Sequence, residues 1–539
     1  MPDVDPYEGS LQREAARGTE TKTFNLPDGR ADEICVVPKH LSFAKYRGKD
    51  GKQDIADEKR LASYDFHKAG AAESDVVAIV PKRTSTSAAI EIFELPPGTT
   101  RPDPITASYC RTVEKDGKCV AKFKQTDNKF TTTSTAAILG YYHVSRALGD
   151  IGEIKPAVLR TMDIAQHKQM VRLAAELGAR GLVGKSWALF DKYYANPSGS
   201  EVKHTLFTSD FKQIYGALLE NTTGERSYTE WLNARSDLTT TRAFQRMADS
   251  RPAEAILGSR AFTQSNVQAL VGMRDMSELI LLDYLLAQSD RLSGGNISDY
   301  SYTYYRDDDK VKSVRTSKAS EIPASAPKVV IKKLTIKDTD GGLLNTNTFE
   351  KKGYIAKISH MHLGTFERLQ IFAAKWQEDP SVREFFHREC TFSNVQMARF
   401  EKYLLAAART LQSRKESGKL RLDLDLDDYF SGVAVEPEPP PPTPKINGTV
   451  GRWEKGATNG AADVKTVQRL LKSAAQKLTE LQLDPKAIDG KIARLPANSN
   501  TVNAIRAFQS RSGLPITELI EPTSETWTKL LLAAGETMS

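Results

Sequence analysis

The sequence predicts an α+β chain of two or three domains, and three observations support this. Its 539 residues exceed what a single hydrophobic core usually organises. Short β-like runs dominate residues 33–125, and longer helical patterns dominate the chain after them. The proline-rich segment 435–444 then sets off a compact helical tail. We therefore expect a β-rich part, a helical part and a separate small helical domain.

The composition is that of a soluble globular protein, with 40% hydrophobic and 27% charged residues. The net charge of +7 comes from 75 basic and 68 acidic residues, a mild bias that gives no reason to expect a nucleic-acid partner. The four cysteines lack C-x-x-C spacing, so we expect reduced thiols in the core and no metal site built on them.

Residues 1–32 are polar and mixed in charge, which predicts a flexible N-terminal tail. They contain no apolar core of the signal-peptide type, and no stretch of the chain reaches the length of a membrane span. We expect synthesis and folding in the cytoplasm, with any export or injection following a route that needs no such signal.

A polar turn, Lys82–Ser87, lies between two β-like runs at 76–80 and 89–95. The backbone N–H groups of its serines and threonines could cover phosphates. The turn contains no glycine, however, and this favours an ordinary hairpin turn.

Two lysines in a second predicted hairpin are candidates for holding an anion. Residues 105–113 and 119–125 predict its strands, and residues 114–118 predict its turn. Lys122 and Lys124 share one face of the second strand. A lysine that points inward from a central strand is costly unless it meets an anion such as a nucleotide phosphate. An exposed strand face is the alternative.

An apolar helical pattern leads into Asp290–Arg291, crosses Gly294–Gly295 and reaches Asn296. An aspartate in such a loop can orient a hydroxyl nucleophile and accept its proton, and an asparagine can hold a magnesium ion through its side-chain oxygen. The alternative is a simple helix C-terminus that stops at the glycines, with Asp290 solvated in a turn.

Another strand, Val329–Lys337, runs directly into Asp338 and Asp340, which two glycines follow. Carboxylates and glycines at the end of a strand suit a divalent cation, because the cation needs oxygen ligands and close approach of the backbone. The segment therefore predicts a metal-binding turn.

The remaining segments predict scaffold. His360 and His362 lack an evident third ligand, so we interpret them as structural residues. The segments expected to form scaffold are helices at 133–148, 365–412 and, for the most part, 164–272, and an alternating acidic strand at 422–428.

Four of these segments, in this order, resemble the atypical, phosphatidylinositol-kinase-like branch of the protein-kinase fold. That branch includes secretory-pathway kinases and HipA-like bacterial kinases. The resembling segments are the lysine strand 120–125, the helix and turn from Ser145 to Pro156, the loop from Leu282 to Asn296, and Ile336–Leu343. The resemblance covers roughly residues 33–432 and implies a bilobal fold with a small β-rich N-lobe and a helical C-lobe.

The resemblance implies that ATP is a cofactor and that Lys124 holds its phosphates, with Lys122 as the second choice. One departure from the family concerns this lysine. The predicted helix 133–148 contains no glutamate, although the family usually pairs one with the lysine. Glu153 is close in sequence but lies beyond the helix.

The resemblance also implies a catalytic loop, in which Asp290, followed by Arg291, is the base. Asn296 and Asp340 would bind Mg²⁺, or Mn²⁺, and Asp338 is an alternative or second ligand. The spacing from Asp290 to Asn296 is one residue longer than usual in the family, and the glycine pair between them can absorb the difference.

Residues 448–539, beyond a linker at 433–447, resemble a peptidoglycan-binding-type domain. This resemblance implies an all-α three-helix fold, with peptidoglycan or a component of a secretion machine as the partner. The insertion at 494–500 departs from the short glycine turn of that family and would remodel a glycan groove. The resembling segments are 463–471, 488–490, 501–509, 513–515 and 520–527.

Together these expectations describe an ATP- and Mg²⁺-dependent kinase that phosphorylates a protein hydroxyl, with a tail that localises or docks it. A kinase with a cell-wall-type module suggests a bacterial protein, delivered as an effector. Two alternatives stay open. One is a catalytically inactive pseudokinase that binds the cell wall or a secretion apparatus, and the missing helix glutamate favours it. The other is a nucleotidyl transferase that uses the same ligands. A kinase requires the candidate residues to meet in one cleft between the lobes.

Overall fold

The computed structural model divides into two compact units, Met1–Val435 and Glu436–Ser539. The boundary between the units falls inside the predicted linker. No helix among the described residues is long and apolar enough to cross a bilayer. The residues that the structure describes are 18–26, 30–67, 77–84, 86–95, 102, 104–127, 133–221, 237–289, 291, 297–343, 345–431, 444–495 and 498–535.

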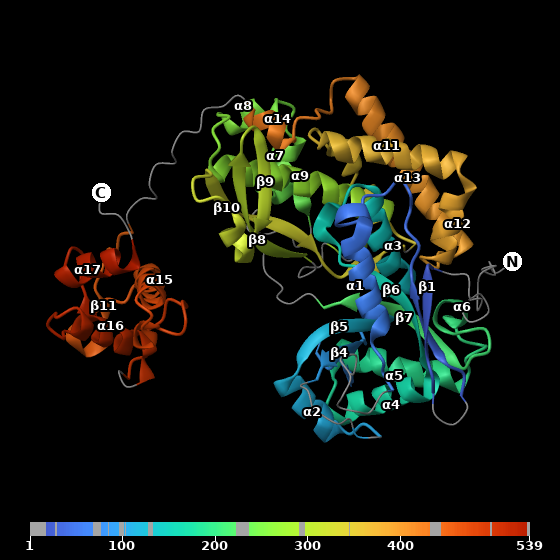
Figure 1. Ribbon diagram of the computed structural model, residues 1–539, viewed down its shortest axis with the longest axis horizontal. Helices are drawn as coiled ribbons and strands as arrows, with labels where there is room; N and C mark the ends of the chain where they lie inside the picture. The colour runs from blue at the N-terminus through green and yellow to red at the C-terminus, as the bar shows by residue number, and fades with distance from the viewer. Residues whose placement is uncertain are drawn as a thin grey trace. The chain divides into compact units, whose positions relative to one another are not determined.

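The N-terminal lobe of the first unit is built on a seven-stranded sheet (Figure 1). Its strand order is β1-β2-β6-β7-β5-β4-β3, and every neighbouring pair is antiparallel. β5, which carries the two candidate lysines, lies in the interior of the sheet between β4 and β7. The strands are β1 Glu20–Phe24, β2 Glu33–Val37, β3 Val77–Pro81, β4 Ile90–Glu94, β5 Lys118–Gln125, β6 Ala157–Asp163 and β7 Gln213–Glu220.

Helices cover both faces of this sheet. Side chains of α2, α4 and α5 form one hydrophobic core with one face. The other face packs against α3, whose side chains belong to the core of the C-terminal lobe. The sheet therefore separates two cores, and α3 connects the two lobes. The helices are α1 Lys52–Ser63, α2 Ala107–Asp116, α3 Thr135–Ala147, α4 Ile164–Glu176, α5 Gly181–Ala195 and α6 Lys203–Leu206.

The C-terminal lobe of the first unit is mainly helical and carries a small antiparallel sheet of order β10-β8-β9. The 22-residue α9 is buried along most of its length and packs against β10 and α7. The elements are α7 Arg242–Ala248, α8 Ala253–Leu257, α9 Gln264–Leu285, β8 Ile297–Asp307, β9 Lys310–Arg315, β10 Lys328–Ile336, α10 Thr348–Lys351, α11 Leu363–Glu378, α12 Pro380–Arg388, α13 Asn394–Glu416 and α14 Leu426–Phe430.

The second unit is a three-helix domain with its own hydrophobic core. The side-chain amide of Gln468 bonds to Asp489, Thr501 and the backbone N–H of Gly490, and thereby ties the turn around Gly490 to α15. Its elements are β11 Val450–Gly451, α15 Ala461–Lys477, α16 Asn500–Arg511, β12 Leu519–Ile520 and α17 Glu525–Ala534.

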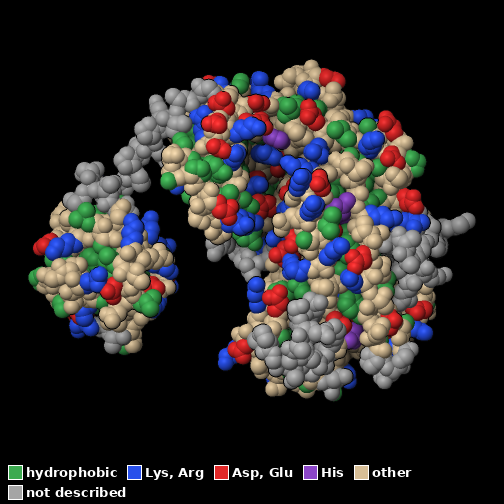
Figure 2. All heavy atoms as spheres, in the orientation of Figure 1, with side chains coloured by type: hydrophobic (Ala, Val, Ile, Leu, Met, Phe, Trp, Pro, Cys, Tyr) green, Lys and Arg blue, Asp and Glu red, His purple; other side chains and the backbone are tan. Residues whose placement is uncertain are grey.

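The predicted fold class is confirmed. The chain is α+β, with a β-sheet lobe followed by a helical lobe and a three-helix domain at the end, which differs from the predicted all-α domain only in the two short paired strands β11 and β12. The N-terminal lobe is larger than predicted, because its sheet has seven strands and carries helices on both faces. Basic and acidic side chains are interspersed over both units on the face shown in Figure 2.

The predicted N-terminal tail, residues 1–32, is wrong for Glu20–Phe24. These residues form β1, which pairs with β2 from Glu20 opposite Val37 to Phe24 opposite Glu33. β1 is an edge strand, so its side chains are partly exposed and can be polar. This polarity concealed the strand in the sequence.

Three other segments also differ from prediction. Residues 107–113, predicted as part of a strand, lie in helix α2, and Thr106 caps this helix by accepting a hydrogen bond from the backbone N–H of Tyr109. Residues 213–220 form the central strand β7 inside a region predicted to be mainly helical. Residues 422–425 belong to no strand, and residues 426–428 lie in helix α14, which Asp425 caps.

Candidate functional site

Lys124 on β5 meets two carboxylates at the junction of the lobes. Its Nζ atom lies 2.9 Å from Oδ2 of Asp340 and 3.2 Å from Oδ1 of Asp338. The side chains of Lys124 and Asp340 are 6% and 11% exposed, whereas that of Asp338 is 40% exposed. The lysine therefore sits in the interior, and Asp338 reaches towards solvent. Three of the predicted site residues meet at this point.

The backbone around the two aspartates turns sharply after β10 ends at Ile336. Asp338 has a φ of 43°, in the left-handed region, which aspartate tolerates better than most residues. A short 3₁₀ turn, Thr339–Gly341, follows. The backbone N–H of Ser134, the N-cap of α3, donates to the carbonyl of Asp340 at 2.9 Å. This turn brings both carboxylates to the same ammonium group.

The charges in this cluster shift each other's titration. Burial alone would lower the pKa of Lys124, but the charges of Asp340 and Asp338 outweigh it and raise that pKa above its ordinary value. In return, the charge of Lys124 lowers the pKa of Asp338 to about 2. Two carboxylates facing one ammonium leave an excess of negative charge. A divalent cation with oxygen ligands suits such a pair.

A pocket opens beside this cluster and encloses about 580 Å³ of empty volume, including space open to solvent. Its lining combines an apolar wall with several ammonium groups and two carboxylates. Such a mixture suits a ligand with a flat apolar part and an anionic part. The lining residues are Lys122, Lys124, Ile138, Ile154, Lys155, Leu219, Glu220, Asn221, Ile336, Lys337, Asp338 and Thr339.

Lys122, the second candidate lysine, lines the same pocket but has a different partner. Its Nζ atom lies 3.6 Å from Oε1 of Glu91 on β4. Lys124, two residues further along β5, holds both aspartates of the turn after β10. The structure thus places the two lysines on one face of β5, as predicted, and gives Lys124 the contacts with the predicted metal ligands.

Arg291 is buried and fully engaged with groups of the protein. Its Nε atom lies 2.8 Å from Oδ2 of Asp283 on α9, and its Nη1 donates to the backbone carbonyl of Lys337. Asp283 also accepts a hydrogen bond from the hydroxyl of Tyr141 on α3 at 2.6 Å. Arg291 therefore links α9, α3 and the end of β10, and its side chain does not face the pocket.

The loop that leads to Asp290 is bonded to the turn that carries the aspartates. The backbone N–H of Leu343 donates to the carbonyl of Leu286 at 2.6 Å, and the side-chain amide of Gln288 donates to the carbonyl of Asp338 at 3.3 Å. The backbone N–H of Ser289 donates to the carbonyl of Gly341 at 3.3 Å. Asp290 and Asn296, the predicted base and metal ligand, lie outside the described residues.

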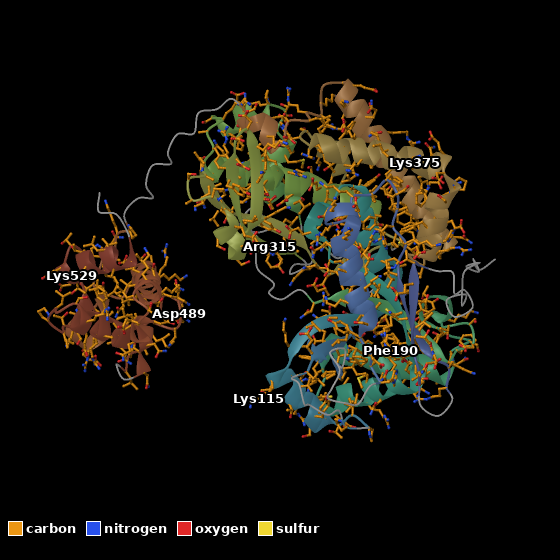
Figure 3. All side chains as sticks on the ribbon, in the orientation of Figure 1. Lys115, Phe190, Arg315, Lys375, Asp489 and Lys529 are labelled. Carbon is orange, nitrogen blue, oxygen red and sulfur yellow. The ribbon has the colours of Figure 1, made fainter. Side chains whose placement is uncertain are left out.

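Glu153 does not hold Lys124 in place of the missing helix glutamate. It is buried among β-strand side chains and lies 2.8 Å from Nη2 of Arg315, a residue of β9 labelled in Figure 3. It also accepts hydrogen bonds from the hydroxyls of Tyr302 and Thr335. No residue of α3 is a glutamate, so the partners of Lys124 come from the turn after β10.

His360 and His362 have structural partners, as the sequence predicted. Nδ1 of His360 lies 2.7 Å from Asp423, and Nε2 of His362 lies 3.2 Å from Asp425. Over the described part of the chain, no three His, Cys, Asp or Glu side chains gather closely enough to hold a metal ion. Asp338 and Asp340 together provide two carboxylates that could bind a metal ion.

Sequence reasoning missed three lysines at or near the pocket. Lys155 lines it and forms an ion pair with Glu220 at 3.2 Å, and Lys337 lines it beside Asp338. Lys82 lies near both Lys122 and Lys124, since burial lowers its pKa and the charges of these two lysines lower it further. Each of these three lysines lies inside a segment that the sequence analysis singled out for another reason, but no local pattern indicates that they converge.

No protein-family model and no curated protein sequence matches the chain. Two solved structures of the Golgi casein kinase are similar to it over much of its length. One has a TM-score of 0.33 and 10% sequence identity, and covers 70% of this chain and 80% of its own. The other, with Mn and ADP bound, has a TM-score of 0.32 and 10% identity, and covers 68% of this chain and 77% of its own. These scores are too low to assign the chain to that family.

Proposed function

We propose that the first unit is an ATP- and Mg²⁺-dependent phosphotransferase that acts on a protein hydroxyl. The observation that carries the proposal is the contact of Lys124 with Asp338 and Asp340 at the edge of a lysine-lined pocket. Phosphoryl transfer needs groups that position a polyphosphate and neutralise its charge, and this cluster contains both an ammonium and a pair of metal-binding carboxylates.

In this proposal the nucleotide occupies the pocket, with its base against the apolar wall and its phosphates towards the lysines. Lys124 holds phosphate oxygens, and Asp338 and Asp340 hold the metal. When bound, Mg²⁺, or Mn²⁺, would neutralise phosphate charge that the lysines leave uncompensated. Of the two aspartates, the more exposed Asp338 lines the pocket, and the more buried Asp340 fixes Lys124.

The remaining candidate residues are assigned roles in the phosphoryl-transfer step. The oxygen of the acceptor hydroxyl forms a bond to the γ-phosphorus, the bond from that phosphorus to the β–γ bridging oxygen breaks, and ADP leaves. Asp290 accepts the hydroxyl proton, and Asn296 is a further metal ligand. Both roles rest on the sequence resemblance. Arg291 acts as a positioning residue, because its contacts hold the loop against α9 and β10.

The test is transfer from γ-labelled ATP with Mg²⁺, scored as self-labelling and as labelling of a mixed protein lysate. Asp340→Ala and Asp290→Ala should each abolish the label. Asp309→Asn is the matched control, since Asp309 lies in the exposed turn between β8 and β9, at the opposite end of β8 from the residue that pairs with Ile336. Label that survives Asp340→Ala would contradict the assignment.

The missing helix glutamate favours a second function, a catalytically inactive nucleotide-binding protein. Lys124 is paired with both aspartates instead. A kinase would use the lysine for phosphate and the aspartates for the metal ion. ATP binding without transfer of either a γ-label or an α-label would support this alternative. Transfer of the α-label alone would support the third possibility, a nucleotidyl transferase.

For the second unit we propose a localisation or docking role, with bacterial peptidoglycan or a component of a secretion machine as the partner. The support is the sequence resemblance together with the three-helix fold. Sedimentation with insoluble peptidoglycan tests the first partner. The full chain should sediment, and a chain that ends at Val435 should stay in the supernatant. Equal behaviour of the two would contradict the peptidoglycan proposal.

A further inference from the structure

Three residues, on β5 and next to the ends of β3 and β4, lie in one row on the face of the seven-stranded sheet from which Lys124 lines the pocket. Pro81 pairs with Ile90, and Ile90 pairs with Phe123. Ile90 and Phe123 belong to the core on the opposite face. Lys82 follows Pro81, Ala89 precedes Ile90, and Lys124 follows Phe123. Strand alternation therefore directs these three side chains to the pocket face of the sheet.

The spacing of this row suits a chain of phosphates. Adjacent strands are about 4.8 Å apart, so the backbones of Lys82 and Lys124 lie roughly 10 Å apart. The residue between them, Ala89, is buried and has only a methyl group. Two long cationic side chains therefore flank a residue with a small side chain, beside the pocket that Lys124 lines.

The backbone of Lys82 is held firmly, although the residue begins a turn. Its N–H donates to the carbonyl of Ala89 at 2.9 Å, and its own carbonyl accepts a hydrogen bond from the indole N–H of Trp187 at 2.9 Å. Trp187 is a buried residue of α5. The origin of the Lys82 side chain is therefore fixed relative to the sheet.

Lys82 differs from its neighbours in lacking a carboxylate. Lys122 is paired with Glu91, and Lys124 with Asp338 and Asp340. Within the described ranges, no carboxylate lies within 4.0 Å of the Lys82 ammonium. Burial, followed by the charges of Lys122 and Lys124, lowers the pKa of Lys82 to about 8. A cation in this position gains from any anion that enters between it and Lys124.

We propose that Lys82 is a second phosphate-binding lysine, which closes with Lys124 on the phosphate chain of the nucleotide. This inference rests on the proposed function of the first unit. Backbone N–H groups of a glycine-rich turn commonly cover phosphates, but the turn from Lys82 to Ser87 has no glycine. Here a side chain supplies the positive charge instead.

The test is equilibrium binding of ATP and of adenosine to the full chain, in the presence of Mg²⁺. Lys82→Met should weaken ATP binding about tenfold or more, because a charge-assisted contact is lost, and should leave adenosine binding unchanged. Lys82→Arg keeps the charge and should stay within about threefold of the wild type. Lys118→Met is the matched control, since Lys118 lies on β5 with its side chain 82% exposed.

Two results would overturn this inference alone. One is ATP affinity of Lys82→Met within twofold of the wild type. The other is an equal loss of ATP and adenosine affinity, which would indicate that the substitution damages the pocket as a whole. A wild-type protein that binds neither ligand would overturn the proposed function itself. Thermal unfolding of each variant without ligand shows whether that variant folds. If Lys82→Met does not fold, the affinities of Lys82→Arg for ATP and adenosine are compared instead.

Discussion

At the scale of single residues, the partners of Lys124 distinguish this site. A buried ammonium must meet opposite charge, and α3, where the sequence resemblance leads us to expect a glutamate, has none. Asp338 and Asp340 take that place from 214 and 216 residues further along the chain. The same carboxylates are the proposed metal ligands, so the lysine and a metal ion compete for them.

The pairing makes stability depend on pH at the acid end. The folded-state pKa of Asp338 is about 2, below its ordinary value of 3.8. A lowered pKa means that ionised Asp338 contributes stability above its ordinary pKa and loses that contribution as the pH falls towards 2. Asp338→Asn should therefore flatten the fall in unfolding free energy between about pH 5 and 2. Urea unfolding across this range measures it.

The control for this measurement is Asp309→Asn, which removes a carboxylate from an exposed turn. Its curve should follow that of the wild type. If Asp338→Asn also follows the wild-type curve, the ion pair with Lys124 does not form in solution.

Arg291 provides a second prediction at this scale. Arg291→Lys keeps the positive charge but removes the forked contact with Asp283 and the bond to the carbonyl of Lys337. Residue 291 would lose its link to α9 and to the end of β10. We expect kcat for phosphate transfer to fall about 10- to 100-fold, with ATP affinity within about threefold of the wild type. Steady-state kinetics and direct ATP binding separate the two. A loss confined to ATP affinity would contradict a positioning role.

At the scale of elements, α3 is the helix on which both lobes pack. All 13 of its residues are buried, including His143 and Arg146. Arg146 is stabilised there by Asp54 of α1 at 2.6 Å and by Asp150. A buried arginine is tolerated only with such partners. The sequence predicted this helix within two residues at its start, but its partners come from α1, far away in the chain.

Gly140 shows how closely α3 is packed. A Cβ atom at this position would lie 2.7 Å from Cζ and 2.8 Å from Cε1 of Phe392. Gly140→Ala should destabilise the protein by about 1–3 kcal/mol, because the clash outweighs the gain of about 1 kcal/mol in helix propensity. Urea unfolding at neutral pH measures the effect.

A double-mutant cycle gives the control for Gly140. In a Phe392→Leu background the smaller side chain leaves room for the new methyl group, so Gly140→Ala should cost less there than in the wild type. Additive costs in the cycle would show that Phe392 is not the group that the methyl meets.

The elements that the sequence missed share a physical cause. β7 is buried on both faces between β5 and β6, so its apolar run has no alternation and looks like a helix segment. In α2, the buried Cys110 and Val113 are three residues apart, a helical spacing that strand-forming residues nearby concealed. Neighbouring elements, and not local propensity, decide such segments.

At the scale of the whole molecule, the two units have separate hydrophobic cores. The core of the second unit consists only of its own residues, from Ile446 to Ala534. A fragment of residues 444–539 should therefore fold alone, with a helical circular dichroism spectrum and a cooperative unfolding transition. The same fragment with Phe508→Ala, which removes a fully buried ring, should be less stable by about 3–5 kcal/mol. A wild-type fragment without helical structure would contradict the independence of this unit.

The sequence by itself determined the order of the parts, the lysine strand, the turn with two aspartates and the proline-rich boundary. These are local properties, set by strand alternation, turn residues and composition. Only the tertiary structure decided that Asp340 and Asp338 hold Lys124, that Arg291 faces inward and that Lys82 stands in a row with Lys124. Ion pairs between residues more than 200 positions apart depend on how strands and turns pack, and no local pattern encodes that packing.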